Sequence, residues 1–123
     1  MPYATADAHT TLEIAELARG EFIARHDADD LMHPLRLADQ VARLEDCRHA
    51  EAVGSPWISI DGNSEVVGRS QRGQIDLRPE SGIRRVPLAH GTILCRRTWM
   101  RRIPYNTELR RAQDRDFWIR AVA

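Results

Sequence analysis

An apolar run leads directly into three carboxylates in the segment Phe22-Ile23-Ala24-Arg25-His26-Asp27-Ala28-Asp29-Asp30. The apolar run is typical of a short buried strand, and a helix signal follows at Pro34-Leu35-Arg36-Leu37. The carboxylates therefore stand where a strand ends and a loop begins, which is where ligands bind in open α/β sheets. Crowded carboxylates repel one another unless a cation lies between them, and hard divalent cations prefer oxygen ligands. We expect a loop for Mg²⁺ or Mn²⁺, shared with a phosphate-bearing substrate.

The flanking segments predict further elements of an α/β fold. A helix beginning at Pro34 has an apolar stripe at helical spacing, formed by Leu37, Val41 and Leu44, which we interpret as core packing. The remaining elements are expected in this order: a helix over 10–20, a hairpin over 52–68 that turns at 61–63, a long loop over 69–85, an extended segment over 86–95, one or two helical turns over 96–102, and a helix over 113–120. Large aromatic residues are expected in the core or at its boundary, namely Trp57, Trp99 and Trp118, with Phe117 and Val122 as further packing residues.

The composition limits the classes of partner. The 123 residues carry 18 acidic and 18 basic side chains, and this balance argues against a general nucleic-acid binder. No apolar run reaches the length of a membrane span, so we expect a soluble, cytoplasmic protein with Cys47 and Cys95 reduced. Arginine pairs cluster late in the chain, and we interpret most of them as a solvated surface. A phosphate-rich ligand or an anionic membrane surface is the alternative for these pairs.

The order of the motifs resembles the central and later part of a glycosyltransferase family 2 catalytic domain, from about Leu12 onward. The ordered motifs are Gly20 through Asp30, Pro34-Leu35-Arg36-Leu37 with Gln40, Val53-Gly54, Asp61-Gly62, His90-Gly91-Thr92, and Gln113-Asp114-Arg115-Asp116-Phe117-Trp118-Ile119-Arg120. The resemblance implies a GT-A fold, a Rossmann-like α/β sandwich with a mixed sheet. Residues 12–123 would be a partial catalytic domain, preceded by a loose arm over 1–11.

The resemblance also implies roles for particular residues. Asp27-Ala28-Asp29 would be the Asp-x-Asp motif of the family, with Asp29 as the metal ligand and Asp27 nearer the nucleotide ribose. Asp30 would orient the loop or cap the following turn. Asp114 would be the general base that takes the proton from the acceptor hydroxyl. His90 would line the donor or acceptor pocket.

The implied reaction is transfer of a sugar from a nucleotide-diphospho-sugar to a hydroxyl of a carbohydrate or lipid-linked acceptor. It would be inverting, would depend on Mn²⁺ or Mg²⁺, and would serve surface polysaccharide or glycoconjugate synthesis. The expected location is the cytoplasm, with peripheral contact at the inner face of the membrane as an open question.

Two departures from the family pattern are visible. Gln113 stands where the family usually has Glu, so one charge beside the proposed base is absent. The family domain also normally opens with a strand, a helix and a second strand that hold the nucleotide, and nothing before Leu12 would supply them.

Other interpretations remain open at this point. The acidic loop also suits a solvated turn, Asp114 a charged surface helix, and His90 a hydrogen-bonded packing position. His26-Asp27 with His33 nearby resembles the metal site of HD-type phosphohydrolases, although His49 and His90 stand in the wrong contexts. From a different class, the chain would be an inactive truncated remnant that acts as a subunit or interaction module, as a homodimer or with a complementing chain.

Overall fold

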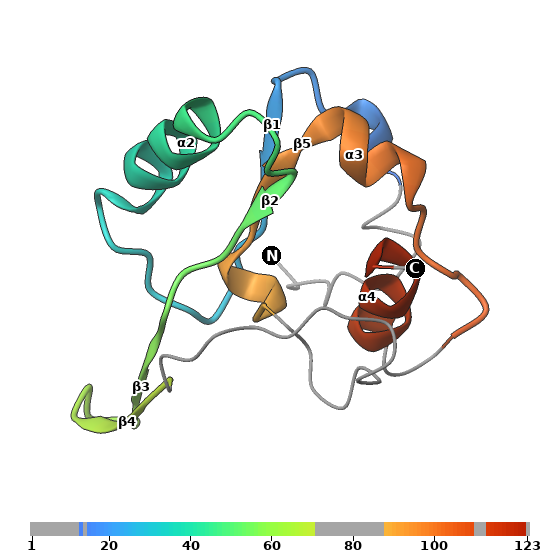
Figure 1. Ribbon diagram of the computed structural model, residues 1–123. Helices are drawn as coiled ribbons and strands as arrows, with labels where there is room; N and C mark the ends of the chain where they lie inside the picture. Colours follow the sequence, from blue (N-terminus) through green and yellow to red (C-terminus); the bar gives the residue numbers. More distant parts are fainter. Residues whose placement is uncertain (1–12, 14, 71–87, 110–112, 123) are drawn as a thin grey trace.

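The computed structural model describes residues 13, 15–70, 88–109 and 113–122, and it shows short strands with helices around them (Figure 1). The elements in chain order are β1 (Phe22–Ala24), α2 (Arg36–Asp46), β2 (Ala52–Val53), β3 (Ile58–Ile60), β4 (Val66–Arg69), the 3-10 helix η2 (His90–Thr92), β5 (Leu94–Arg96), α3 (Arg97–Arg102) and α4 (Gln113–Val122). Residues 15–17 form a further short helical stretch before β1. The α/β fold class expected from the sequence is confirmed.

β5 lies between β1 and β2 in a three-stranded sheet and is antiparallel to both (Figure 1). Ile23 pairs with Cys95 on one side, and Val53 pairs with Leu94 on the other. Because both neighbours run opposite to β5, the carboxyl ends of β1 and β2 lie beside the first residue of β5, at one end of the sheet. Three segments therefore meet at this end of the sheet: the one after β1, the one after β2, and η2.

α2 contacts β2 and β5 and buries one polar and one apolar side chain, Gln40 and Leu44. These two residues are one turn apart, so they lie on the same side of the helix. The expected stripe was wrong at Leu37, which is 39% exposed. The strands beneath α2 are only two and three residues long, and they provide little apolar surface under its first turn.

The main core lies on the other face of the sheet, where the side chains of Ile23 and Cys95 point. Its buried members are Ala15, Ile23, Ile93, Cys95, Trp99, Met100, Tyr105, Phe117 and Trp118. Tyr105 stacks on Phe117 with ring centroids 5.0 Å apart and an angle of 15° between the rings. The expectation of a packed C-terminal helix with Phe117, Trp99 and Trp118 in the core is confirmed. Val122 has a side chain outside the described residues.

Cys95 is a thiol in this core. Burial raises the pKa of Cys95 to about 12, so the thiol stays neutral, and its Sγ lies 3.7 Å from the carbonyl oxygen of Ile23. Cys47 is exposed, and both cysteines are free.

The predicted hairpin is confirmed for β3 and β4, which are antiparallel with a bulge next to Ser59. Its expected start at 52–53 was wrong, because these residues form β2 and pair with β5. The Asp61 carboxylate accepts hydrogen bonds from the backbone N–H groups of Asn63 and Glu65 at 2.8 and 3.0 Å. Ser64 has a φ of 64°, so the left-handed residue of the turn is Ser64. The hairpin lies away from the helices (Figure 1), and its large apolar side chains are exposed. Trp57, expected in the core or at its boundary, is 49% exposed beside it.

The extended segment expected over 86–95 was partly wrong. Residues 90–92 form η2, and the strand begins only at Leu94. The long loop expected over 69–85 lies outside the described residues from 71 onward, as does the arm over 1–11.

Arg96 and Arg97 are exceptions to the interpretation of the late arginines as a solvated surface, because both are only partly exposed, and Arg101 is exposed but also donates hydrogen bonds within the protein. Arg96 donates to the carbonyl oxygens of Leu44 and Ala50 at 2.7 and 3.1 Å. Arg97 and Arg101 donate to carbonyl oxygens at 15–19, where the short helical stretch ends. These guanidinium groups satisfy backbone acceptors that have no partner inside their own elements.

No helix in the described part of the chain is long and apolar enough to cross a membrane.

Candidate active site

The acidic loop is a tight turn at the carboxyl end of β1. The backbone N–H of Asp30 donates to the carbonyl oxygen of Asp27 at 3.1 Å, which leaves Ala28 and Asp29 at the tip. The carboxyl side chains of this turn are exposed. The ring of His26 closes the turn, because its Nε2 donates to the carbonyl oxygen of Asp30 at 3.1 Å. The structure thus places the sequence-predicted metal ligand, Asp29, where a bound molecule can reach it.

η2 lies directly beside this turn. A Cβ built on Gly91 would lie 2.8 Å from Oδ2 of Asp27 and 3.1 Å from its Cγ. The Asp27 carboxylate therefore lies directly against the backbone of Gly91. The antiparallel pairing of β1 with β5 brings these residues together, since the turn follows β1 and η2 precedes β5.

Two polar residues of α2 bind backbone carbonyl groups at the end of the sheet where the turn and η2 meet. Arg36 Nη2 donates to the carbonyl oxygens of Arg25 and Ile93 at 2.7 and 3.3 Å. Burial lowers the pKa of Arg36 from its ordinary value, because desolvation disfavours the charged guanidinium group. Gln40 Nε2 donates to the carbonyl oxygen of Thr92 at 2.7 Å, and Arg36 Nε donates to Gln40 Oε1 at 3.1 Å. Together they fix the backbone at the end of β1 and in η2.

His90 lies on the other side of η2, among aromatic rings. It is hydrogen-bonded with the hydroxyl of Tyr105, which also accepts a hydrogen bond from Arg25 Nη1 at 3.1 Å. The His90 ring centroid is 5.5 Å from that of Phe117 in an edge-on arrangement. His90 thus joins the strand that carries the acidic turn to α4. Its expected role in lining a substrate pocket stays a prediction.

Asp114, the predicted base, lies in the first turn of α4, and its side chain is outside the described residues. Phe117 and Trp118 follow on the same helix, α4. Both rings contact His90. The structure therefore connects α4, the helix of Asp114, with η2.

The carboxylates of the turn suit a cation that is shared with a substrate. Among the described residues, no three His, Cys, Asp or Glu side chains gather closely enough to hold a metal on their own. Mg²⁺ in nucleotide sites commonly takes one or two carboxylates and completes its shell with phosphate oxygens and water. Asp29 and Asp27 on one exposed turn match that donor set.

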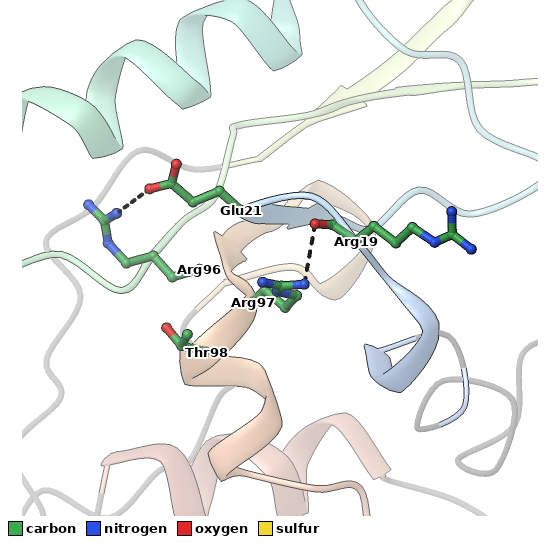
Figure 2. A pocket seen from close by; sticks show the side chains of 5 residues that line it. All are labelled: Arg19, Glu21, Arg96, Arg97 and Thr98. Atoms are coloured by element: carbon green, nitrogen blue, oxygen red, sulfur yellow. Dashed lines mark hydrogen bonds and ion pairs between the residues drawn. The ribbon is translucent and has the colours of Figure 1, made fainter.

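A cavity of about 380 Å³ lies at the opposite end of the sheet, where β1 begins and β5 ends (Figure 2). It is lined by Arg19, Glu21, Arg96, Arg97 and Thr98. Three of its charged side chains are engaged within the protein (Figure 2): Glu21 pairs with Arg96 at 3.6 Å, and Arg97 donates to the Arg19 carbonyl oxygen at 3.2 Å. We therefore place the candidate site at the acidic turn and not in this cavity.

Reasoning from the sequence missed Arg36, Gln40 and Tyr105 as residues that shape the site. The signal for Gln40 was present, because it stands four residues before Leu44 on the buried side of a helix. A polar side chain at such a position needs hydrogen-bond partners, and these come from the edge of the sheet. Tyr105 had no comparable signal.

Comparison with known proteins agrees with this geometry. Residues 11–111 match the family model described as glycosyl transferase family 2. The chain belongs to glycosyltransferase family 2. The match includes the acidic turn, α2 and η2, and it ends three residues before Asp114.

Two relatives within curated proteins support the family. A Bacillus subtilis (strain 168) protein named "Putative glycosyltransferase EpsE" is 39% identical over 108 residues, which is 84% of this chain and 37% of that protein. A Methanocaldococcus jannaschii protein named "Uncharacterized glycosyltransferase MJ1057" is 28% identical over 109 residues, covering 87% and 38% respectively. The chain thus spans well under half the length of these family 2 relatives. No solved structure matches the chain significantly.

Proposed function

We propose that this chain acts in the transfer of a sugar from a nucleotide-diphospho-sugar to a hydroxyl of a carbohydrate or lipid-linked acceptor. The observation that carries the proposal is the exposed acidic turn at the end of β1, which the family match includes. The turn presents carboxylates of Asp27 and Asp29, and buried contacts of α2 hold the backbone on which it stands.

In this proposal, Asp29 holds a Mg²⁺ or Mn²⁺ ion against the donor diphosphate. The ion would neutralise charge on the departing nucleoside diphosphate. Asp27, which contacts η2 at Gly91, orients the ribose side of the donor. Asp114 accepts the proton of the acceptor hydroxyl as that oxygen attacks the anomeric carbon, which inverts the configuration in one displacement. We further propose that the product belongs to a surface polysaccharide or a glycoconjugate.

The test is calorimetric titration of the purified chain with UDP, GDP and dTDP, with Mn²⁺ present and then chelated. We expect one nucleotide to bind only with the cation, and Asp29→Asn to lose that binding. Asp46→Asn is the matched control, since Asp46 is also exposed but lies at the end of α2.

Two results would count against the proposal. Cation-dependent binding that persists in Asp29→Asn would remove Asp29 from its role. A folded chain that binds none of the nucleotides would favour a subunit role instead. Asp114→Asn is expected to spare donor binding and abolish sugar transfer, and retained turnover would overturn the assignment of the base.

A further inference from the structure

We propose that Gly91 is a positioning residue: the absence of a side chain at this position sets where the carboxylate of Asp27 lies. The inference deepens the function proposed above, because Asp27 belongs to the proposed donor site. It rests on how closely η2 approaches the acidic turn.

The contact leaves no room for a methyl group. A Cβ on Gly91 would lie 2.8 Å from Oδ2, 3.1 Å from Cγ and 3.5 Å from Oδ1 of Asp27. Nonbonded carbon and oxygen atoms do not rest as close as the first of these distances, so one of the two groups must move if a methyl group is added. All three atoms belong to the Asp27 side chain, and no backbone atom of the turn is among them.

If a methyl group is added at Gly91, we expect the Asp27 side chain to move and not η2, because η2 is anchored at both ends. Gln40 Nε2 donates to the Thr92 carbonyl oxygen at 2.7 Å, and Thr92 Oγ1 donates to the Ala89 carbonyl oxygen at 2.7 Å. His90 is hydrogen-bonded with Tyr105 and packs edge-on against Phe117. The Asp27 carboxylate, in contrast, is the end of a short, exposed side chain that can rotate about its own bonds.

Backbone conformation gives no separate reason for a glycine here. Gly91 does not adopt the left-handed φ that disfavours other residues. Replacement by alanine is therefore compatible with the backbone of η2, and it lowers the entropy of the unfolded chain. The space occupied by Asp27 is what requires glycine at position 91.

The experiment compares Gly91→Ala with Gly62→Ala in the full chain. Gly62 is the matched control, since a Cβ there would meet no atom within 4 Å. The first readout is the χ1 rotamer of Asp27, measured by NMR couplings of its β protons. The second is the cation-dependent affinity for whichever of UDP, GDP and dTDP the wild-type chain binds, and the third is the thermal unfolding midpoint.

We expect Gly91→Ala to change the Asp27 rotamer, to keep or slightly raise the wild-type midpoint, and to weaken nucleotide binding by roughly 10- to 100-fold, as loss of ligand orientation commonly does. In an Asp27→Ala background there is no carboxylate to displace, so Gly91→Ala should have no further effect on affinity. Gly62→Ala should change none of the three readouts.

An unchanged Asp27 rotamer in Gly91→Ala would overturn the proposal. So would a large fall in the unfolding midpoint, because it would show that the methyl group displaces η2. If wild-type protein binds none of UDP, GDP and dTDP, the proposed function fails, but the Asp27 rotamer still decides the role of Gly91. The two proposals can thus fail separately.

Discussion

Gln40 shows how a single polar side chain connects the segments at one end of the sheet. It is 4% exposed, and it is the one polar residue among the buried side chains of the described part of the chain. Its Nε2 donates at 2.7 Å both to Ser55 Oγ and to the Thr92 carbonyl oxygen. Buried polar groups require such partners, and removing one partner leaves the other unsatisfied. Gln40 therefore joins α2, the segment after β2, and η2.

We expect Gln40→Leu to lower the free energy of unfolding by about 1–3 kcal/mol, because the partly buried Thr92 carbonyl loses its donor. Urea denaturation followed by circular dichroism measures the change. Glu45→Leu introduces the same side chain at an exposed position of α2 and should change stability by less than about 0.5 kcal/mol. Equal effects of the two substitutions would refute the role of the buried hydrogen bonds.

At the scale of elements, α3 secures the segment before β1. Arg97 and Arg101 stand one turn apart on α3, and both donate to carbonyl oxygens of residues 15–19. A helix end leaves carbonyl groups without intrahelical partners, and positive charge is favourable there. α3 thus caps the short helical stretch through contacts that are distant in sequence.

We expect Arg101→Ala to destabilise the protein by about 1 kcal/mol and to speed amide hydrogen exchange at residues 18–20. The magnitude is modest because the Arg101 side chain is exposed to water. Exchange monitored by mass spectrometry gives the local effect. Arg48→Ala, at an exposed site after α2, is the control, and equal exchange rates in both variants would contradict the capping role.

Elements with strong local signals could be predicted from the sequence. α2 and α4 follow from helical periodicity, and the β3–β4 hairpin follows from its turn residues. η2 could not be predicted as a helix, because three residues carry little local preference and contacts with α2 and α4 hold it.

The same division applies to the candidate site. The acidic turn at the end of β1 follows from an apolar run ending in carboxylates. The contact of Asp27 with Gly91 does not, because it depends on the register of β1 against β5. The carbonyl partners of the late arginines likewise arise only once distant segments are packed together.

For the whole molecule, α4 supplies the centre of the core. Phe117 is fully buried and packs against rings from three other segments, those of His90, Trp99 and Tyr105. Such a residue contributes both its own burial and the packing of its neighbours. The core on this face of the sheet is therefore completed by the last described helix.

We expect Phe117→Ala to cost about 3–5 kcal/mol of unfolding free energy, because a cavity forms among aromatic rings. Ile119→Ala is the comparison on the same helix, where the side chain is 47% exposed and the cost should be much smaller. Chemical denaturation of both variants measures the difference. Similar costs would show that α4 contributes little to the core.

The central place of β5 has a consequence for how the protein is made. β1 and β2 each pair with β5 in the described sheet, and Ile23 precedes its partner Cys95 by 72 residues. A chain emerging from the ribosome therefore exposes both strands, without this partner, until β5 has been synthesised. Contacts so distant in sequence form slowly, and an unpaired apolar strand is prone to aggregate in the meantime. We therefore expect the nascent chain to need chaperones until β5 emerges.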